Sequence, residues 1–165
     1  MAHTVIRTDL MPGTDVASDL VSLRYYVSTT KTEIDNGAIV KIGDLETGER
    51  EIRKATAAAN DDAIRDLAVI ATPEVMYDER KKNLDEFYNE AGAICRGYRL
   101  DHGRIFSITA DGFASSPTSL TVGAELGIGS NGKVATSVTS GKTKLGTLIA
   151  IETTKRYTYY VIEVA

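Results

Sequence analysis

Two glycine-containing segments have the residue types found in phosphate-binding loops. Residues 127–132, Gly-Ile-Gly-Ser-Asn-Gly, fit the spacing G-x-G-x-x-G. In a dinucleotide site this spacing lies between a strand and a helix that faces the pyrophosphate, but residues 133–138 have no helical period. Residues 141–143, Gly-Lys-Thr, resemble the end of a phosphate loop, yet Thr136 occupies a position that the motif reserves for glycine. We predict a glycine-rich hairpin at 127–132 and no nucleotide site.

The single cysteine, Cys95, and His102 are the residue types of a nucleophile and its base. Such pairs form in space, so their separation along the chain neither supports nor forbids one. A lone cysteine is more often a small buried hydrophobic residue, and His102 lies in Asp-His-Gly, which is typical of a turn. His3 is too far along the chain from both to make a recognisable zinc spacing. We predict no catalytic residue, no metal site and no cofactor.

Four carboxylates in the most charge-dense stretch have the chemistry for acid–base catalysis or calcium binding: Glu79, Asp85, Glu86 and Glu90. Catalytic carboxyl groups need pKa values shifted by burial, whereas these residues lie close to the basic residues 80–82. The spacing of a calcium loop is absent. We interpret the stretch as a solvated surface.

Three tyrosines, Tyr157, Tyr159 and Tyr160, lie near the C-terminus. Such side chains stack on sugars or bases, or pack between sheets. Packing is favoured here, because the chain offers no basic groove for nucleic acid. Residues 156–164 are aromatic and β-branched to their end, so we predict that this last strand belongs to the core.

These residues are expected to lie on many short strands separated by Asn-Gly, Asp-Gly and other turn signals. The pattern predicts a mainly β chain: a single-domain β-sandwich or partly open β-barrel with one or two short helical turns. The turns are expected near 60–65, capped by residues 60–62, and near 84–88. Strands are expected at 23–27, 38–42, 49–54 (an exposed edge), 67–71, 97–100 paired with 104–109 as a hairpin, 120–122, 125–128, 133–138, 145–151 and 156–164.

Composition excludes several classes of function. The net charge of −4, with basic residues scattered among acidic ones, gives no electrostatic footprint for nucleic acid. No apolar run approaches the ~20 residues of a membrane span. One cysteine allows no intrachain disulfide, and residues 1–4 do not resemble a secretory signal. We expect folding in a cytoplasm, with residues 1–22 as an N-terminal arm or short lead-in segment and 23–165 as one β-rich domain.

Several short motifs resemble a known family. They are Asn-Gly-Ala-Ile-Val-Lys-Ile-Gly at 36–43, Thr-Pro-Glu-Val-Met-Tyr-Asp-Glu-Arg at 72–80, Asn-Glu-Ala-Gly at 89–92, Gly-Tyr-Arg-Leu at 97–100 and Ile-Phe-Ser-Ile at 105–108. From about residue 33 to the end, the chain is similar to head decoration, or auxiliary capsid, proteins of tailed phages and prophages of Gram-positive bacteria.

The resemblance implies a non-enzymatic structural protein of the virion. It would be made in the host cytoplasm, bind the outer surface of the assembled capsid and stabilise it as a decoration or cement protein. The implied partner is the major capsid protein, with a possible homo-oligomer on the capsid and no nucleic acid or membrane partner. The alternative is a carbohydrate- or host-binding module on the virion surface.

The N-terminal segment lies outside this resemblance. Val5, Ile6 and Leu10 are its candidate capsid contacts, because a terminal arm can become ordered on binding and add a strand to a neighbour's sheet. The alternative is that the segment pairs within its own domain.

Overall fold

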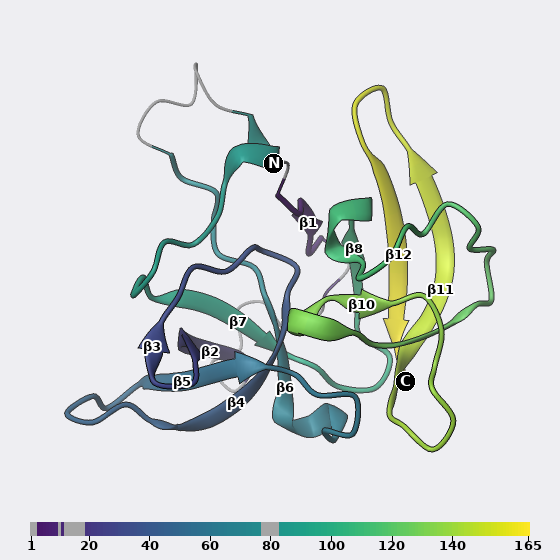
Figure 1. Cartoon of the computed structure of the whole chain (residues 1–165). Coiled ribbons are helices and arrows are strands. Elements are labelled where there is room, and N and C mark those ends of the chain that lie inside the picture. The colour runs from purple at the N-terminus through teal and green to yellow at the C-terminus, as the bar shows by residue number, and fades with distance from the viewer. Residues whose placement is uncertain (1–2, 10, 12–18, 77–82) are drawn as a thin grey trace.

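The computed structural model describes residues 3–9, 11, 19–76 and 83–165. They form two β-sheets that pack side by side, connected by loops and short 3₁₀ turns (Figure 1). The predicted mainly β, single-domain fold is confirmed.

The first sheet closes into a five-stranded barrel. Its strands are β2 (Leu20–Val27), β5 (Ile52–Ala57), β4 (Ile39–Leu45), β6 (Leu67–Ile70) and β7 (Cys95–Arg99), and β7 pairs back with β2. The short β3 (Thr30–Lys31) pairs with the end of β2. All these pairings are antiparallel except β2 with β5.

The interior of the barrel is filled by its own cluster of buried apolar side chains. Alternate residues of β2, such as Leu23 and Tyr25, point inward because side chains of a strand alternate between its faces. Gly97 of β7 faces Leu23 and Val21, and a Cβ atom there would lie 2.6 Å from Cδ1 of Leu23. A larger residue at this position would therefore overpack the barrel.

The second sheet has the order β1-β8-β12-β11-β9-β10 and is antiparallel throughout. Its strands are β1 (Ile6–Arg7), β8 (Ile105–Ile108), β12 (Thr158–Val164), β11 (Lys144–Thr153), β9 (Glu125–Ile128) and β10 (Val134–Ala135). A bridge between Phe113 and Val134 brings the segment after β8 next to β10, so the sheet curls toward closure.

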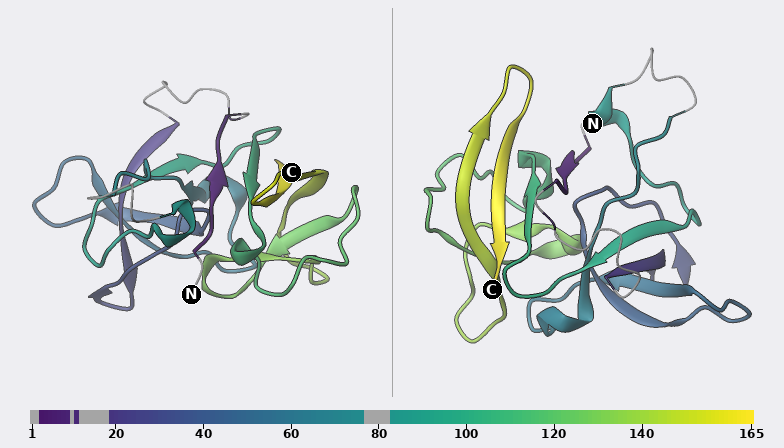
Figure 2. Two further views of the ribbon diagram at one scale, coloured as in Figure 1. Left: turned by 90° about the horizontal axis from the view of Figure 1, so that it is seen from above. Right: turned by 180° about the vertical axis from the view of Figure 1, so that it is seen from behind.

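One strand belongs to both cores. Every residue of β6 is buried: Ala68 and Ile70 face the barrel interior, whereas Leu67 and Val69 pack against the second sheet. The core between the sheets also contains Phe106 of β8 and other residues from β4, β7, β9, β11 and β12. Figure 2 shows the two sheets side by side from two further directions.

Four 3₁₀ turns occur in the described part of the chain, more than the one or two expected. They are η1 (Ile64–Asp66), η2 (Leu84–Glu86), η3 (Ala110–Gly112) and η4 (Ser130–Gly132). The predicted turn near 84–88 is confirmed by η2. The turn near 60–65 begins later than expected and has Ala63 at its N-cap, because the Asp62 carboxylate accepts a hydrogen bond from the Ala59 amide instead.

Several predicted strands differ from those observed. The segment at 49–54 is not an edge: β5 starts at Ile52 and lies between β2 and β4. Residues 97–109 form no hairpin, because β7 joins the barrel and β8 the second sheet. Residues 120–122 form no strand, and the segment at 133–138 keeps only the two residues of β10.

Candidate protein-binding surface

Two of the three N-terminal candidate contacts lie inside the domain. Ile6 pairs with Ile108 of β8, and Val5 exchanges hydrogen bonds with Thr109, whose amide donates to the Val5 carbonyl at 3.1 Å. Val5 and Ile6 are only 4% and 8% exposed, whereas Leu10 lies outside the described residues. Val5 and Ile6 therefore pair within their own domain, in agreement with the alternative to a free arm. The expected boundary after residue 22 also falls inside β2.

Cys95 and His102, which have the residue types of a nucleophile and its base, occupy different environments. Cys95 is 2% exposed in the barrel interior, and burial raises the pKa of its thiol to about 11. His102 is exposed in the turn that follows β7. A buried, protonated thiol is a poor nucleophile, so the geometry gives this pair no reactive character.

The two glycine segments are loops of the second sheet. Residues 129–133 connect β9 to β10, and the Gly129 amide donates to the Lys133 carbonyl at 2.7 Å, so the predicted hairpin is confirmed. Gly132 lies so close to β4 that a Cβ atom there would be 2.5 Å from the Ile39 carbonyl oxygen. Residues 141–143 belong to the loop before β11, where Lys142 faces Asp61 at 3.8 Å.

Of the four carboxylates singled out in the sequence, Glu79 lies outside the described residues. Glu90 is exposed, and the Glu86 carboxylate accepts a hydrogen bond from the Asn83 amide at the start of η2. Asp85 is half-buried and accepts a hydrogen bond from the Tyr157 hydroxyl. Within the described residues no three histidine, cysteine or acidic side chains are grouped closely enough to hold a metal ion.

Several of the family-like motifs converge on one buried cluster of hydrogen bonds. Asn36, which is fully buried, uses its side chain to bond both the amide and the carbonyl of Thr72. The Asn89 side chain donates to Asn36 Oδ1 and to the Ile34 carbonyl, each at 3.1 Å. Asn36 and Asn89 are 53 positions apart in the sequence. The motifs therefore mark a structural clamp that fastens the segment after η2 to the barrel, which their spacing alone did not reveal.

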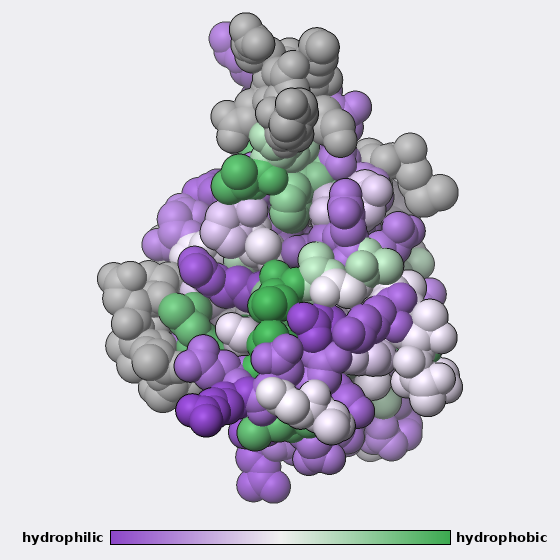
Figure 3. Space-filling view, turned by 90° about the vertical axis from the view of Figure 1, so that its left-hand side faces the viewer, coloured by the Kyte–Doolittle hydropathy of each residue, from purple (hydrophilic) through white to green (hydrophobic). Residues whose placement is uncertain are grey.

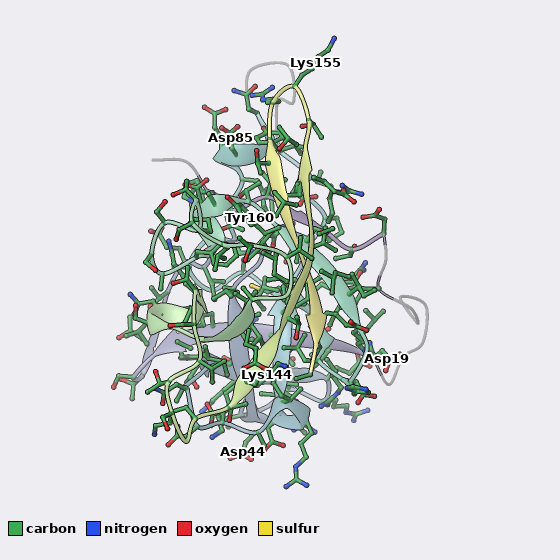
Figure 4. All side chains as sticks on the ribbon, turned by 90° about the vertical axis from the view of Figure 1, so that its right-hand side faces the viewer. Asp19, Asp44, Asp85, Lys144, Lys155 and Tyr160 are labelled. Atoms are coloured by element: carbon green, nitrogen blue, oxygen red, sulfur yellow. The ribbon has the colours of Figure 1, made fainter. Side chains whose placement is uncertain are left out.

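The most prominent exposed feature is the hairpin of β11 and β12, which extends beyond the rest of the second sheet (Figure 1). Pairing continues to Thr153 and Thr158, and residues 151–156 are exposed. Lys155 lies at the tip and points away from the body (Figure 4). Ile151, 40% exposed, adds an apolar side chain close to the tip.

The hairpin tip is held by its own hydrogen bonds. The Thr154 amide and hydroxyl both donate to the Tyr157 carbonyl at 2.8 Å, and the hydroxyl accepts from the Tyr157 amide at 3.0 Å. Further down, Arg7 of β1 pairs with Glu152 at 2.5 Å and lies over the ring of Tyr159. These contacts make the hairpin an ordered projection.

The three C-terminal tyrosines mostly serve packing. Tyr159 and Tyr160 are 7% and 6% exposed, and the Tyr160 ring makes an edge contact with Phe113 at 5.1 Å. Tyr157 is half-buried and lies 6.0 Å from Tyr159, centroid to centroid. The predicted core position of the last strand is confirmed, and few tyrosine faces remain for stacking.

The face shown in Figure 3 is mainly hydrophilic, with small separate hydrophobic patches. In the described part of the chain, no helix has the length and hydrophobicity needed to cross a membrane.

Comparisons with known proteins identify no relative: no family model matches the chain, and neither does any curated protein or solved structure.

Proposed function

We propose that this protein is a non-enzymatic structural component of a virion that binds the outer surface of an assembled phage capsid and stabilises it. The observation that carries the proposal is the β11–β12 hairpin, which projects from a body whose two sheets pack against each other through a common apolar core. A protein that reinforces a lattice needs a stiff body and a preorganised contact, because ordering on binding lowers affinity. The resemblance of the sequence motifs to decoration proteins supports the same assignment.

The polar groups of the body support the proposal as well. The Asn36–Asn89 clamp and the ion pair between Arg104 and Asp19, at 2.5 Å, tie separate segments of the chain together. These polar groups hold segments of the fold in place rather than lining a reactive site. The thiol of Cys95 is also unsuited to nucleophilic catalysis, because burial raises its pKa to about 11. The burial of Tyr159 and Tyr160 weakens the alternative of a carbohydrate-binding module, which needs exposed aromatic faces.

The test is co-sedimentation of the purified protein with empty capsid shells and, in parallel, with unassembled major capsid protein of the same phage. We expect saturable binding to shells and much weaker binding to unassembled subunits. Stoichiometric binding to cell-wall glycans without binding to shells would overturn the proposal in favour of the host-binding alternative.

A pair of matched variants tests the hairpin. Ile151→Ser with Lys155→Ser removes one aliphatic and one basic side chain from the exposed tip, and Leu45→Ser with Arg50→Ser makes the same chemical change at the exposed end of β4 and its loop. We expect the first double variant to lose shell binding while the second retains it. Equal binding by both would exclude the hairpin as the contact.

A further inference from the structure

A pocket of about 440 Å³ lies between one end of the barrel and the turns η3 and η4 of the second sheet. Its walls come from the N-terminal segment, the end of β2, the loop after β3 and the turns η3 and η4. The barrel and the second sheet both contribute, so the pocket exists only in the assembled fold. Its volume is within the range of about 300–1,000 Å³ found for ligand sites.

One wall of the pocket is apolar and includes an available phenol. Ile34 and Ala38 are buried there, and Val27 is 53% exposed. Tyr25 also lines the pocket and is only 8% exposed, yet no hydrogen bond joins its hydroxyl to another described residue. The hydroxyl oxygen is not among the fully enclosed polar atoms without a partner, so it remains accessible from the pocket and free to bond an occupant.

The rim of the pocket is acidic. Glu33, Asp35 and Asp111 supply three negative charges and Lys133 one positive charge, a net of −2 with histidine neutral. Lys133 Nζ donates to the backbone carbonyl of Asp111 at 2.9 Å, and His3 Nδ1 lies 2.6 Å from Asp35 Oδ1. The electrostatic balance therefore favours a cationic occupant.

The distribution of the carboxylates distinguishes between cations. They line the pocket, and in the described part of the chain they form no group that could hold a metal ion. Separated acceptors suit a planar guanidinium, which has five donors and stacks on aromatic rings, better than a compact ammonium or a metal. A long aliphatic stem would cover the wall formed by Val27 and Ile34.

We propose that this pocket binds an arginine side chain of a partner protein. The guanidinium lies among Glu33, Asp35 and Asp111, and the Tyr25 hydroxyl faces the backbone or stem of the bound segment. The inference goes beyond the capsid assignment and does not depend on it, because it is tested on the isolated chain.

The test follows backbone amide signals of the full ¹⁵N-labelled chain by NMR during titration with acetyl-Gly-Arg-Gly-amide. The control peptide contains citrulline, which has nearly the same shape without the charge. We expect saturable shifts at Tyr25, Gly37, Gly112 and Asn131 with the arginine peptide, and roughly fivefold weaker binding of the citrulline peptide.

Three variants locate the site. Tyr25→Phe removes only the hydroxyl, and Glu33→Gln removes one exposed charge; each should weaken arginine-peptide binding at least twofold. Asp44→Asn makes an equivalent charge change on an exposed part of β4 that does not line the pocket, and should leave binding unchanged. Equal binding of both peptides, equally tight binding of a lysine peptide, insensitivity to both pocket variants, or no saturable shift up to the peptide's solubility limit would each overturn the proposal.

Discussion

At the scale of single residues, Cys95 is a packing residue of the barrel interior. Its burial and its pKa of about 11 keep the thiol protonated at neutral pH. We expect Cys95→Ala to lower the free energy of unfolding by about 1–2 kcal/mol, because a small cavity replaces the sulfur. Urea unfolding measures this loss, and shell binding should be unchanged. A folded Cys95→Ala protein that no longer bound shells would contradict the assignment.

Glu46 is the second informative residue, because it accepts hydrogen bonds from three side chains at the end of β4. Tyr26 donates its hydroxyl at 2.6 Å, Lys31 Nζ lies at 3.0 Å, and Arg24 also pairs with this carboxylate. The hydrogen bonds from Tyr26 and Lys31 are the main reason that the pKa of Glu46 falls from 4.5 to about 2. The cluster connects β2, β3 and the end of β4.

The lowered pKa of Glu46 predicts a specific acid dependence. The pKa of Glu46 is 4.5 in the unfolded chain and about 2 in the folded protein, so between these pH values the unfolded chain binds more protons than the folded protein. The stabilisation from Glu46 is therefore fully present above pH 4.5 and is lost as the pH falls toward 2. Glu46→Gln should therefore lower the Tm at pH 6, and its difference from the unaltered protein should shrink steadily toward pH 2.5. Thermal unfolding followed by circular dichroism measures both.

Glu49→Gln is the matched control for this experiment, because Glu49 is exposed in the neighbouring loop. Its small effect on Tm should not vary over the same pH window. A Glu46→Gln difference that stayed constant with pH would show that the carboxylate is not stabilised by its partners.

At the scale of elements, β1 tests whether the N-terminal segment belongs to the fold. Ile6 is buried against the second sheet. We expect Ile6→Ala to cost about 2–4 kcal/mol, which lowers the Tm by roughly 5–15 °C in a domain of this size. Deletion of residues 2–11 should have a larger effect. An unchanged Tm with loss of shell binding would instead support a free arm.

The strand β12 tests the C-terminal part of the core. It lies between β8 and β11, with Ile162 fully buried and Glu163 exposed. Ile162→Ala should lower the free energy of unfolding by about 2–5 kcal/mol, and Glu163→Ala by at most about 0.5 kcal/mol. Urea titration measures both. Similar small effects for the two variants would contradict the burial of this strand.

At the scale of the whole molecule, the shared strand β6 predicts that both sheets unfold together. Leu67 and Val69 contribute to one core, and Ala68 and Ile70 to the other. Native-state amide exchange should therefore give similar opening free energies for Leu23 in the barrel and Ile162 in the second sheet. A barrel amide that opened several kcal/mol more easily, by an independent transition, would show two separate folding units.

The sequence by itself determined the fold class and several local features. Alternating β-branched and aromatic residues predicted the strand at 156–164, and an uninterrupted apolar run predicted the buried strand at 67–71. Asn-Gly at 131–132 predicted a hairpin connection. These features depend on neighbours a few residues apart, so local patterns carry enough information to identify them. The lack of a helical period after 132 likewise excluded a dinucleotide site.

Only the tertiary structure decided which strands pair and where polar side chains meet. Residues 97–109 have the pattern of a hairpin, yet β7 joins the barrel and β8 the second sheet, and both faces of β6 are buried in the resulting fold. Val5 and Ile6 gave no strong strand signal and acquire a partner only from β8, about a hundred residues away. The Asn36–Asn89 clamp and the acidic pocket beside Tyr25 also join distant segments. Such contacts depend on the global burial of surface, which no local pattern encodes.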